Sequence, residues 1–150
     1  MLFRSPRRRP EKRRLKRAFA FLFLLAGCAA PPSSSDGNAV VYDAWRTQRS
    51  HVEVTASGVI ARDLGTRSGI RSPHEGFLLH LSGASGRGLT VRVEANVDFT
   101  GPMPIAAGAP VVVRGEYEFD SRGGVIHYTH RDPRGRHPDG YIELQNKRYG

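Results

Sequence analysis

Apolar and polar residues alternate along several short stretches of the chain, which is the pattern of a β-strand with one buried face. The clearest stretch is 89–97, where apolar Val91, Val93, Ala95 and Val97 alternate with Arg92, Glu94, Asn96 and Asp98. The same alternation marks 77–81, where Phe77, Leu79 and Leu81 share a face, and 110–119. Each stretch predicts one strand of an antiparallel sheet.

Weaker patterns predict the remaining elements. Val52 and Val54, followed by Val59 and Ala61, indicate a first strand that bends at Gly58, where a Gly permits a bulge. Residues 120–124 predict a hairpin turn that leads to a fifth strand at 125–129. The remaining residues predict, in chain order, a short helix at 39–48 that packs Val40 and Ala44, a loop at 63–76, a tight turn at 83–88, an irregular link at 99–109, and a turn-rich tail with a short apolar piece at 141–144.

Five short strands with an irregular link before the fourth predict an all-β fold. We expect a small closed five-stranded barrel of the OB type, since residues 107–115 (AGAPVVVRG) resemble the entry to the fourth strand of such domains. A small β-sandwich is the alternative.

The position of the charges changes how the net charge of +9 is interpreted. Nine of the 23 Lys and Arg residues lie in residues 1–27, together with a single acid, Glu11. The rest of the chain carries 14 basic and 13 acidic side chains and is nearly neutral. A nucleic-acid partner, which a basic domain would favour, is therefore not expected.

The leader has the organisation of a bacterial lipoprotein signal peptide. Its basic stretch precedes an apolar run at 18–27, shorter than the roughly 20 residues that a membrane-spanning helix needs. The run ends in Leu25-Ala26-Gly27-Cys28, which resembles the lipobox, a motif in which the Cys becomes the lipid-modified N-terminus. Cys28 is the only Cys, so no disulfide is expected.

These features predict three segments: a signal peptide at 1–27, the lipidated Cys28 with a flexible tether at 28–38, and a single β-barrel domain at 39–150. Ala29 follows the Cys at the position where an Asp would favour retention in the inner membrane. We therefore expect the membrane as a partner through Cys28, and a lipid-anchored protein of the outer membrane that faces the periplasm.

The segment HYTHRDPRGRHPDGYI at 127–142 concentrates the candidate chemistry. Together with Gly115-Glu116-Tyr117, the Gly-Gly turn at 123–124 and an upstream His74, it resembles the C-terminal signature of a small bacterial family known only as a domain of unknown function. Members of that family often carry export signals. The resemblance covers 52–149 and implies no activity. Tyr128 and Tyr141 stand where the family pattern has Trp, and the loop at 63–76 is longer, but no candidate ligand is lost.

The histidines of this segment suggest a metal site. Imidazole and carboxylate groups together suit a divalent transition metal such as zinc. His127 and His130 are three residues apart, so in a regular strand they point to opposite faces. A site of His130, His137 and Asp132, closed by His74, is therefore easier to build, and His127 joins only if the strand ends or bulges before residue 130.

Three arginines add positive charge that could hold an anion: Arg131, Arg134 and Arg136. The expected function is thus a binding module for a metal ion, a small anionic ligand or an envelope partner protein. A metal-bound water with a His or Asp as general base could instead hydrolyse a phosphodiester. A metal-dependent hydrolase of the phosphodiesterase or nuclease kind is therefore the alternative.

The same segment also has a purely structural interpretation. Asp132 and Asp139 would then accept hydrogen bonds from nearby backbone N–H groups, and Gly135 and Gly140 would supply positive φ angles in the turns. The arginines would form a solvated face. The two histidines outside the candidate set are expected at the surface: His51 and His80.

Overall fold

The structure is a computed structural model that describes residue 1 and residues 34–69, 72–81 and 88–150. The leader, Cys28, the start of the predicted tether and most of the predicted turn at 83–88 lie outside these residues. The described elements are α1 (Ser34–Arg46), β1 (Val52–Ser68), β2 (Pro73–Leu81), β3 (Leu89–Asn96), α2 (Val97–Thr100), β4 (Pro110–Glu118), β5 (Val125–His127), β6 (Tyr141–Leu144) and β7 (Lys147–Tyr149). Neither described helix has the length and apolar character needed to cross a membrane.

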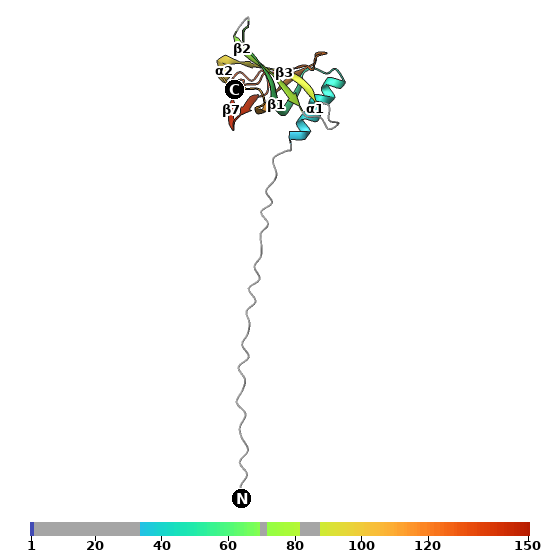
Figure 1. The fold of residues 1–150 in the computed structure, drawn as a ribbon, viewed down its shortest axis with the longest axis vertical. Helices are drawn as coiled ribbons and strands as arrows, with labels where there is room; N and C mark the ends of the chain where they lie inside the picture. Colours follow the sequence, from blue (N-terminus) through green and yellow to red (C-terminus); the bar gives the residue numbers. More distant parts are fainter. Residues whose placement is uncertain (2–33, 70–71, 82–87) are drawn as a thin grey trace.

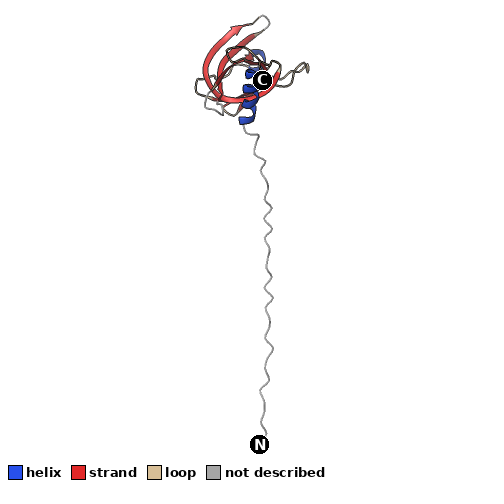
Figure 2. Cartoon of the chain, turned by 90° about the vertical axis from the view of Figure 1, so that its right-hand side faces the viewer, coloured by secondary structure: helices blue, strands red, loops and turns tan. Residues whose placement is uncertain are grey.

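The strands form one continuous sheet in the order β1-β2-β3-β5-β4-β6-β7 (Figure 1). An additional pairing of β1 with β4 closes the first five of these strands into a ring, which Figure 2 shows curving around a common interior. Every pairing is antiparallel except that of β3 with β5. The predicted all-β fold with a closed five-stranded arrangement is confirmed, whereas a sandwich would need two sheets. The short strands β6 and β7 extend the sheet beyond β4.

Alternate residues of the strands fill the interior of the ring, as the sequence pattern predicts. The inward side chains are Phe77, Leu79 and Leu81 of β2, Val91, Val93 and Ala95 of β3, and Val111, Val113 and Tyr117 of β4. Helix α1 adds Val41 and Ala44, whereas the predicted Val40 is exposed. The Tyr42 hydroxyl fastens the helix to the ring, because it donates to the Leu81 carbonyl and accepts from the Leu89 N–H.

The predicted loop at 63–76 is wrong, because β1 continues to Ser68 and β2 begins at Pro73. The Gly- and Ser-rich composition indicated a loop. However, β2 supplies hydrogen-bonding partners along the whole stretch, and two register shifts absorb the irregular residues, one between Ile60 and Arg62 and one between Asp63 and Gly65.

The first strand keeps the same face inward through Gly58. Val54, Ala56 and Ile60 are buried, while Val59 is 42% exposed, so the predicted inward placement of Val59 and Ala61 is wrong. A Cβ at Gly58 would lie 2.1 Å from the His80 carbonyl oxygen. The Gly therefore permits close approach of β1 to β2 rather than a bulge.

Two other boundaries differ from prediction. Helix α1 begins at Ser34, inside the predicted tether, and Asn38 is buried. The Asn38 side chain exchanges two hydrogen bonds of 2.9 Å with the backbone of Ser57, which explains why the helix starts early. Val97, predicted as the end of the third strand, belongs to α2.

Candidate functional site

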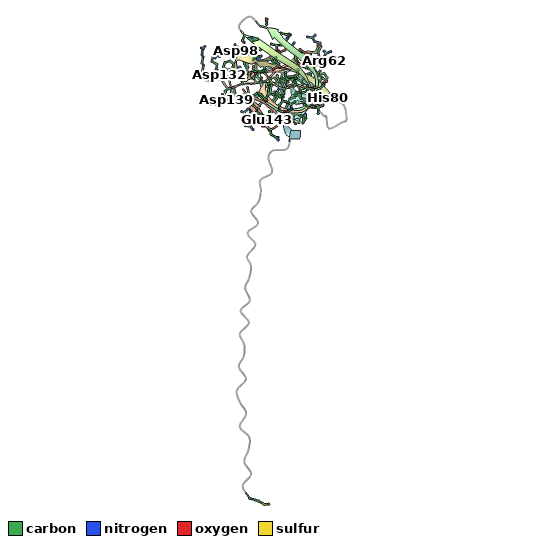
Figure 3. The ribbon with its side chains drawn as sticks, turned by 60° about the vertical axis from the view of Figure 1, so that its left-hand side comes forward. Arg62, His80, Asp98, Asp132, Asp139 and Glu143 are labelled. Atoms are coloured by element: carbon green, nitrogen blue, oxygen red, sulfur yellow. The ribbon has the colours of Figure 1, made fainter. Side chains whose placement is uncertain are left out.

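Five of the six histidines line one cleft of about 520 Å³, which we call the histidine cleft: His51, His74, His127, His130 and His137. Glu94 and Asn96 of β3 and Glu116 of β4 also line it, and these side chains alternate with the buried ones. The cleft therefore lies on the outward face of the ring. His80 lies elsewhere, on the side of the domain opposite Asp132 and Asp139 in Figure 3.

The early end of β5 brings the histidines of the C-terminal segment together. The strand ends at His127 rather than at the predicted residue 129, and Tyr128 adopts a left-handed φ of 51°. Thr129 is buried, and its hydroxyl donates to the Glu94 carbonyl at 3.0 Å. The chain turns there across the outward face. His127 and His130 therefore both line the cleft, although a regular strand would have separated them.

Asp132 organises the loop that follows. Its side chain is 1% exposed, and its carboxylate accepts the backbone N–H groups of Arg134, Arg136 and His137. Burial raises the pKa of Asp132, but the N–H donors of Arg134 and Arg136 outweigh it and lower the pKa to about 2. Asp139 accepts the N–H of Asp132 at 3.0 Å. Both aspartates therefore accept backbone N–H groups that hold the loop, and Asp132 Oδ2 also lies 3.9 Å from His137 Nε2.

The predicted arginine triplet does not converge on one point. Arg131 is 78% exposed and lies 3.8 Å from Asp139, while Arg136 is 62% exposed and pairs with Asp132. Arg134 is exposed, and Arg136 alone among the three lines the cleft. All three arginines are exposed.

Three of the cleft histidines have the same ring nitrogen fixed by the backbone, and we call them the three-imidazole group. The contacts are His74 Nδ1 to the Ser72 carbonyl at 3.0 Å, His130 Nδ1 to the Arg131 carbonyl at 2.7 Å, and His137 Nδ1 to the Pro138 carbonyl at 2.8 Å. A carbonyl oxygen can only accept, so each Nδ1 carries the hydrogen. In each neutral ring, Nε2 is then the atom with the free lone pair.

Aromatic packing holds two members of the group side by side. The His130 ring stacks on Phe99 of α2 at 4.2 Å, and the His137 ring meets it edge-on with centroids 5.0 Å apart. His137 has a side chain only 8% exposed, and its Nε2 is buried without a hydrogen-bond partner. The ring nitrogens of His74, His130 and His137 are not all within 4.8 Å of one another. The three-imidazole group is therefore not arranged around a single point.

Assembled ligand atoms lie at the edge of the cleft, where Glu118 adjoins the lining residues His51 and Glu116. Atoms of His51, Glu116 and Glu118 lie within 4.8 Å of one another, as in no other group of three such residues in the described ranges. His127 Nε2 lies 3.5 Å from Glu116 and 3.8 Å from Glu118. We call these four residues the carboxylate cluster. The sequence predicted His51 only as a surface residue and gave no sign of the carboxylate cluster. The alternation along β4 shows that both glutamates face outward, but not that they lie beside His51.

Charge within this cluster shifts two pKa values in opposite directions. The hydrogen bond to Glu116 and the charge of Glu118 raise the pKa of His51. Burial raises the pKa of Glu118, but hydrogen bonds from Ser50 and Glu116 and the nearby His51 and His127 lower it overall.

Tyr128 separates the carboxylate cluster from the three-imidazole group. Its ring stacks on His127 with centroids 4.1 Å apart and on His137 with centroids 4.4 Å apart. The one cleft therefore presents two ligand sets of different composition, one of imidazoles and one of imidazoles with carboxylates.

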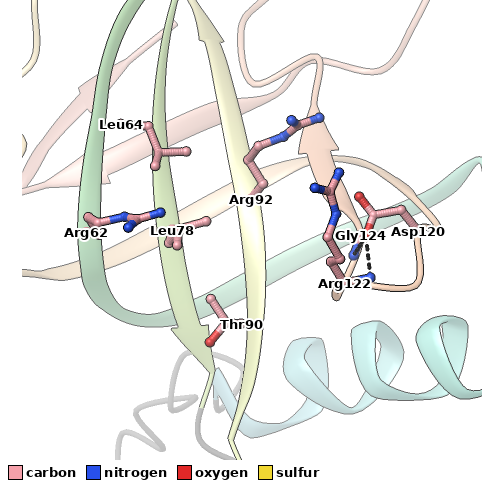
Figure 4. Close-up of a pocket in the computed structure, with 8 residues that line it drawn as sticks. All are labelled: Arg62, Leu64, Leu78, Thr90, Arg92, Asp120, Arg122 and Gly124. Atoms are coloured by element: carbon pink, nitrogen blue, oxygen red, sulfur yellow. Dashed lines mark hydrogen bonds between the residues drawn. The ribbon is translucent and has the colours of Figure 1, made fainter.

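A smaller cavity, of about 270 Å³, is lined by residues of β1, β2 and β3 and of the hairpin turn before β5 (Figure 4). Arg62, Arg92 and Arg122 line it, but Arg92 pairs with Glu94 at 3.2 Å and Asp120 also lines the wall. The Asp120 carboxylate accepts the N–H groups of Arg122 and Gly124, which fixes the hairpin turn. This cavity contains none of the predicted site residues.

Residues 22–150 match the model of a family whose description is "Protein of unknown function (DUF3465)". This match confirms the resemblance to a family of unknown function. Neither the curated proteins nor the solved structures contain a match to the chain.

Proposed function

We propose a function for this chain, which belongs to the DUF3465 family: it is a cell-envelope lipoprotein that binds a divalent transition-metal ion, such as zinc, in the histidine cleft. The ligands are His130 and His137, joined by His74. The protein is anchored through Cys28 to the outer membrane and faces the periplasm.

The sequence supports the envelope location. A basic stretch, an apolar run too short to span a bilayer and the Leu-Ala-Gly-Cys sequence at 25–28 follow one another in the order of a lipoprotein leader. The residues directly after Cys28 include Pro31 and Pro32, which precede helix α1.

The observation that carries the metal proposal is the common hydrogen bond of the three-imidazole group. A metal-binding His almost always donates its second ring nitrogen to a carbonyl or carboxylate, which fixes the tautomer and the ring orientation. His74, His130 and His137 each make this bond to a main-chain carbonyl. The buried Nε2 of His137 without a hydrogen-bond partner is costly unless a ligand satisfies it.

An all-nitrogen set determines which ions fit. Imidazole suits Zn²⁺, Cu²⁺ and Ni²⁺, whereas Mg²⁺ and Ca²⁺ prefer oxygen ligands. His130 and His137 are already packed against each other, so we expect them to bind first. His74 Nε2 is the third nitrogen of the set.

The test measures Zn²⁺ and Co²⁺ binding to the full-length protein in detergent after treatment with a chelator. We expect the wild type to bind Zn²⁺, and His137→Ala and His130→Ala to weaken binding at least about tenfold. His80→Ala is the matched control, because His80 lies outside the cleft, and it should bind as the wild type does.

Zn²⁺ affinity that is equal in His137→Ala, His130→Ala and the wild type would refute the proposed ligands. Absence of Zn²⁺ and Co²⁺ binding to a folded wild type, checked by circular dichroism, would refute metal binding at this group.

A further inference from the structure

We infer that the carboxylate cluster, made of His51, His127, Glu116 and Glu118, is a second metal site with its own ion preference. It uses none of the three ligands of the proposed function and stands on different observations. The occupant is a divalent ion that accepts both nitrogen and oxygen ligands, such as Mn²⁺ or Zn²⁺.

Three of the four side chains, those of His51, Glu116 and Glu118, already have ligand atoms within 4.8 Å of one another, and His127 lies beside the two glutamates. His51 Nδ1 lies 3.1 Å from Glu116 Oε1 and 2.7 Å from Glu118 Oε1. His127 Nε2 lies 3.5 Å and 3.8 Å from the same two oxygens. Two atoms that bind one ion at about 2.0–2.2 Å are separated by about 3–4 Å. The cluster thus has the dimensions of a metal site without rearrangement of the backbone.

The ring closure brings these residues together. Glu116 and Glu118 are two residues apart on β4 and therefore share its outward face. β5 pairs with one side of β4 and places His127 opposite Glu116. β1 pairs with the other side and places Val52 opposite Tyr117, so His51 reaches the same two carboxylates from the second neighbour.

The charge of the cluster is not balanced by any fixed cation. Two carboxylates on one face of a strand repel each other. Within residues 34–69, 72–81 and 88–150, no Lys or Arg forms an ion pair with Glu116 or Glu118, and their charged contacts are the two histidines. A divalent cation would supply the missing positive charge.

His127 gives an independent indication of a ligand. Its Nε2 is buried and has no hydrogen-bond partner, although it faces the two glutamates. A neutral imidazole in this position can place a lone pair on an ion between the carboxylates. Two imidazoles and two carboxylates form a mixed set that accepts Mn²⁺ as well as Zn²⁺, whereas the three-imidazole group lacks the oxygen ligands that Mn²⁺ prefers.

The test titrates the full-length, metal-free protein in detergent with Mn²⁺ and follows free Mn²⁺ by electron paramagnetic resonance. We expect the wild type to bind one equivalent. Glu116→Gln and Glu118→Gln, which keep the side-chain shape but remove the charge, should each weaken binding by tenfold or more. His51→Asn should do the same, and because its side chain is 79% exposed and precedes β1, this variant tests the site without disturbing the sheet.

Two variants separate this inference from other outcomes. Glu53→Gln is the matched control, because Glu53 lies opposite Glu116 in the sheet but is exposed and outside the cluster, and it should bind Mn²⁺ as the wild type does. His137→Ala should lose tight Zn²⁺ binding at the three-imidazole group and keep Mn²⁺ binding. Mn²⁺ affinity unchanged in Glu116→Gln and His51→Asn, or no Mn²⁺ binding to the wild type, would overturn the second site while leaving the Zn²⁺ result of His137→Ala intact.

Discussion

Glu116 and His127 are directly opposite each other in the pairing of β4 with β5, and the His127 Nε2 lies 3.5 Å from the Glu116 carboxylate. The pair sits where the ring of strands closes and where the histidine cleft opens. Its two residues therefore link the stability of the fold to the geometry of the candidate site.

This cross-strand pair should contribute measurably to folding. In metal-free buffer, a double-mutant cycle with Glu116→Gln and His127→Gln is expected to give a coupling free energy of about 0.2–1 kcal/mol, the usual range for a cross-strand pair of side chains. Urea unfolding of the four proteins measures it. A coupling indistinguishable from zero would show that the two side chains do not interact in solution.

Asp132 should make the protein sensitive to acid. Its folded-state pKa of about 2 lies below the ordinary value of 3.8, so its stabilising contribution is complete above pH 3.8 and is lost as the pH falls toward 2. Asp132→Asn should be less stable than the wild type at neutral pH and lose less stability over this acid range. Urea unfolding at several pH values tests this. Asp98→Asn, an exposed change outside the loop, should follow the wild type, and an unaltered acid dependence in Asp132→Asn would contradict the loop role.

Gly115 should not tolerate a side chain. A Cβ at this position would lie 2.2 Å from the His127 carbonyl oxygen, so Gly115→Ala must push β5 away from β4. We expect a loss of about 1–3 kcal/mol in the free energy of unfolding. Gly76→Ala is the control, because its nearest contact would be an ordinary 3.5 Å, and it should be close to neutral. Equal effects of the two substitutions would argue against close approach of the strands.

The continuous inward face of β1 can be tested with two adjacent residues. Ile60 is 1% exposed and Val59 is 42% exposed. Ile60→Ala should therefore destabilise the protein by about 2–5 kcal/mol, whereas Val59→Ala should change stability by roughly 0.5 kcal/mol or less. Thermal or urea unfolding distinguishes this order from the reversed one that a change of face at Gly58 would produce.

The lipid anchor can be tested by fractionation of cells. Cys28→Ser removes the thiol that would carry the lipid and should move the protein from the membrane fraction to the soluble fraction. Ala29→Ser leaves the Cys in place and should remain with the membrane. Continued recovery of Cys28→Ser in the membrane fraction would contradict the anchor.

The period-two pattern predicted the buried faces of β2, β3 and β4 because burial of alternate residues is a property of one strand at a time. The prediction from sequence failed at 63–76, because the Gly and Ser residues there suggested a loop instead of a strand. There β2 supplies the hydrogen-bonding partners that keep β1 extended to Ser68. It also failed at Val59, because the packing of β2 against Gly58, rather than the residues of β1 alone, fixes the local geometry.

The candidate site was also predicted only in part, because some of its residues come together only through contacts between distant segments. His130, His137 and His74 stand out in the sequence and do line the cleft, together with His127. Asp132 has the residue type of a ligand, but its backbone N–H partners are visible only once the loop is folded. His51 and the two glutamates give no local signal, since they are separated by more than 60 residues along the chain.

The amino-acid pattern alone was enough to predict the buried faces of β2, β3 and β4, the closed five-stranded arrangement and the group of histidines near the C-terminus. These features depend on residue type and on spacing within short segments. The folded chain was needed to show that β5 ends at His127, that Asp132 accepts backbone N–H groups and that His51 meets Glu116 and Glu118. Those contacts depend on the register of β1 and β5 against β4, and outward polar residues impose no periodic burial pattern from which that register could be read.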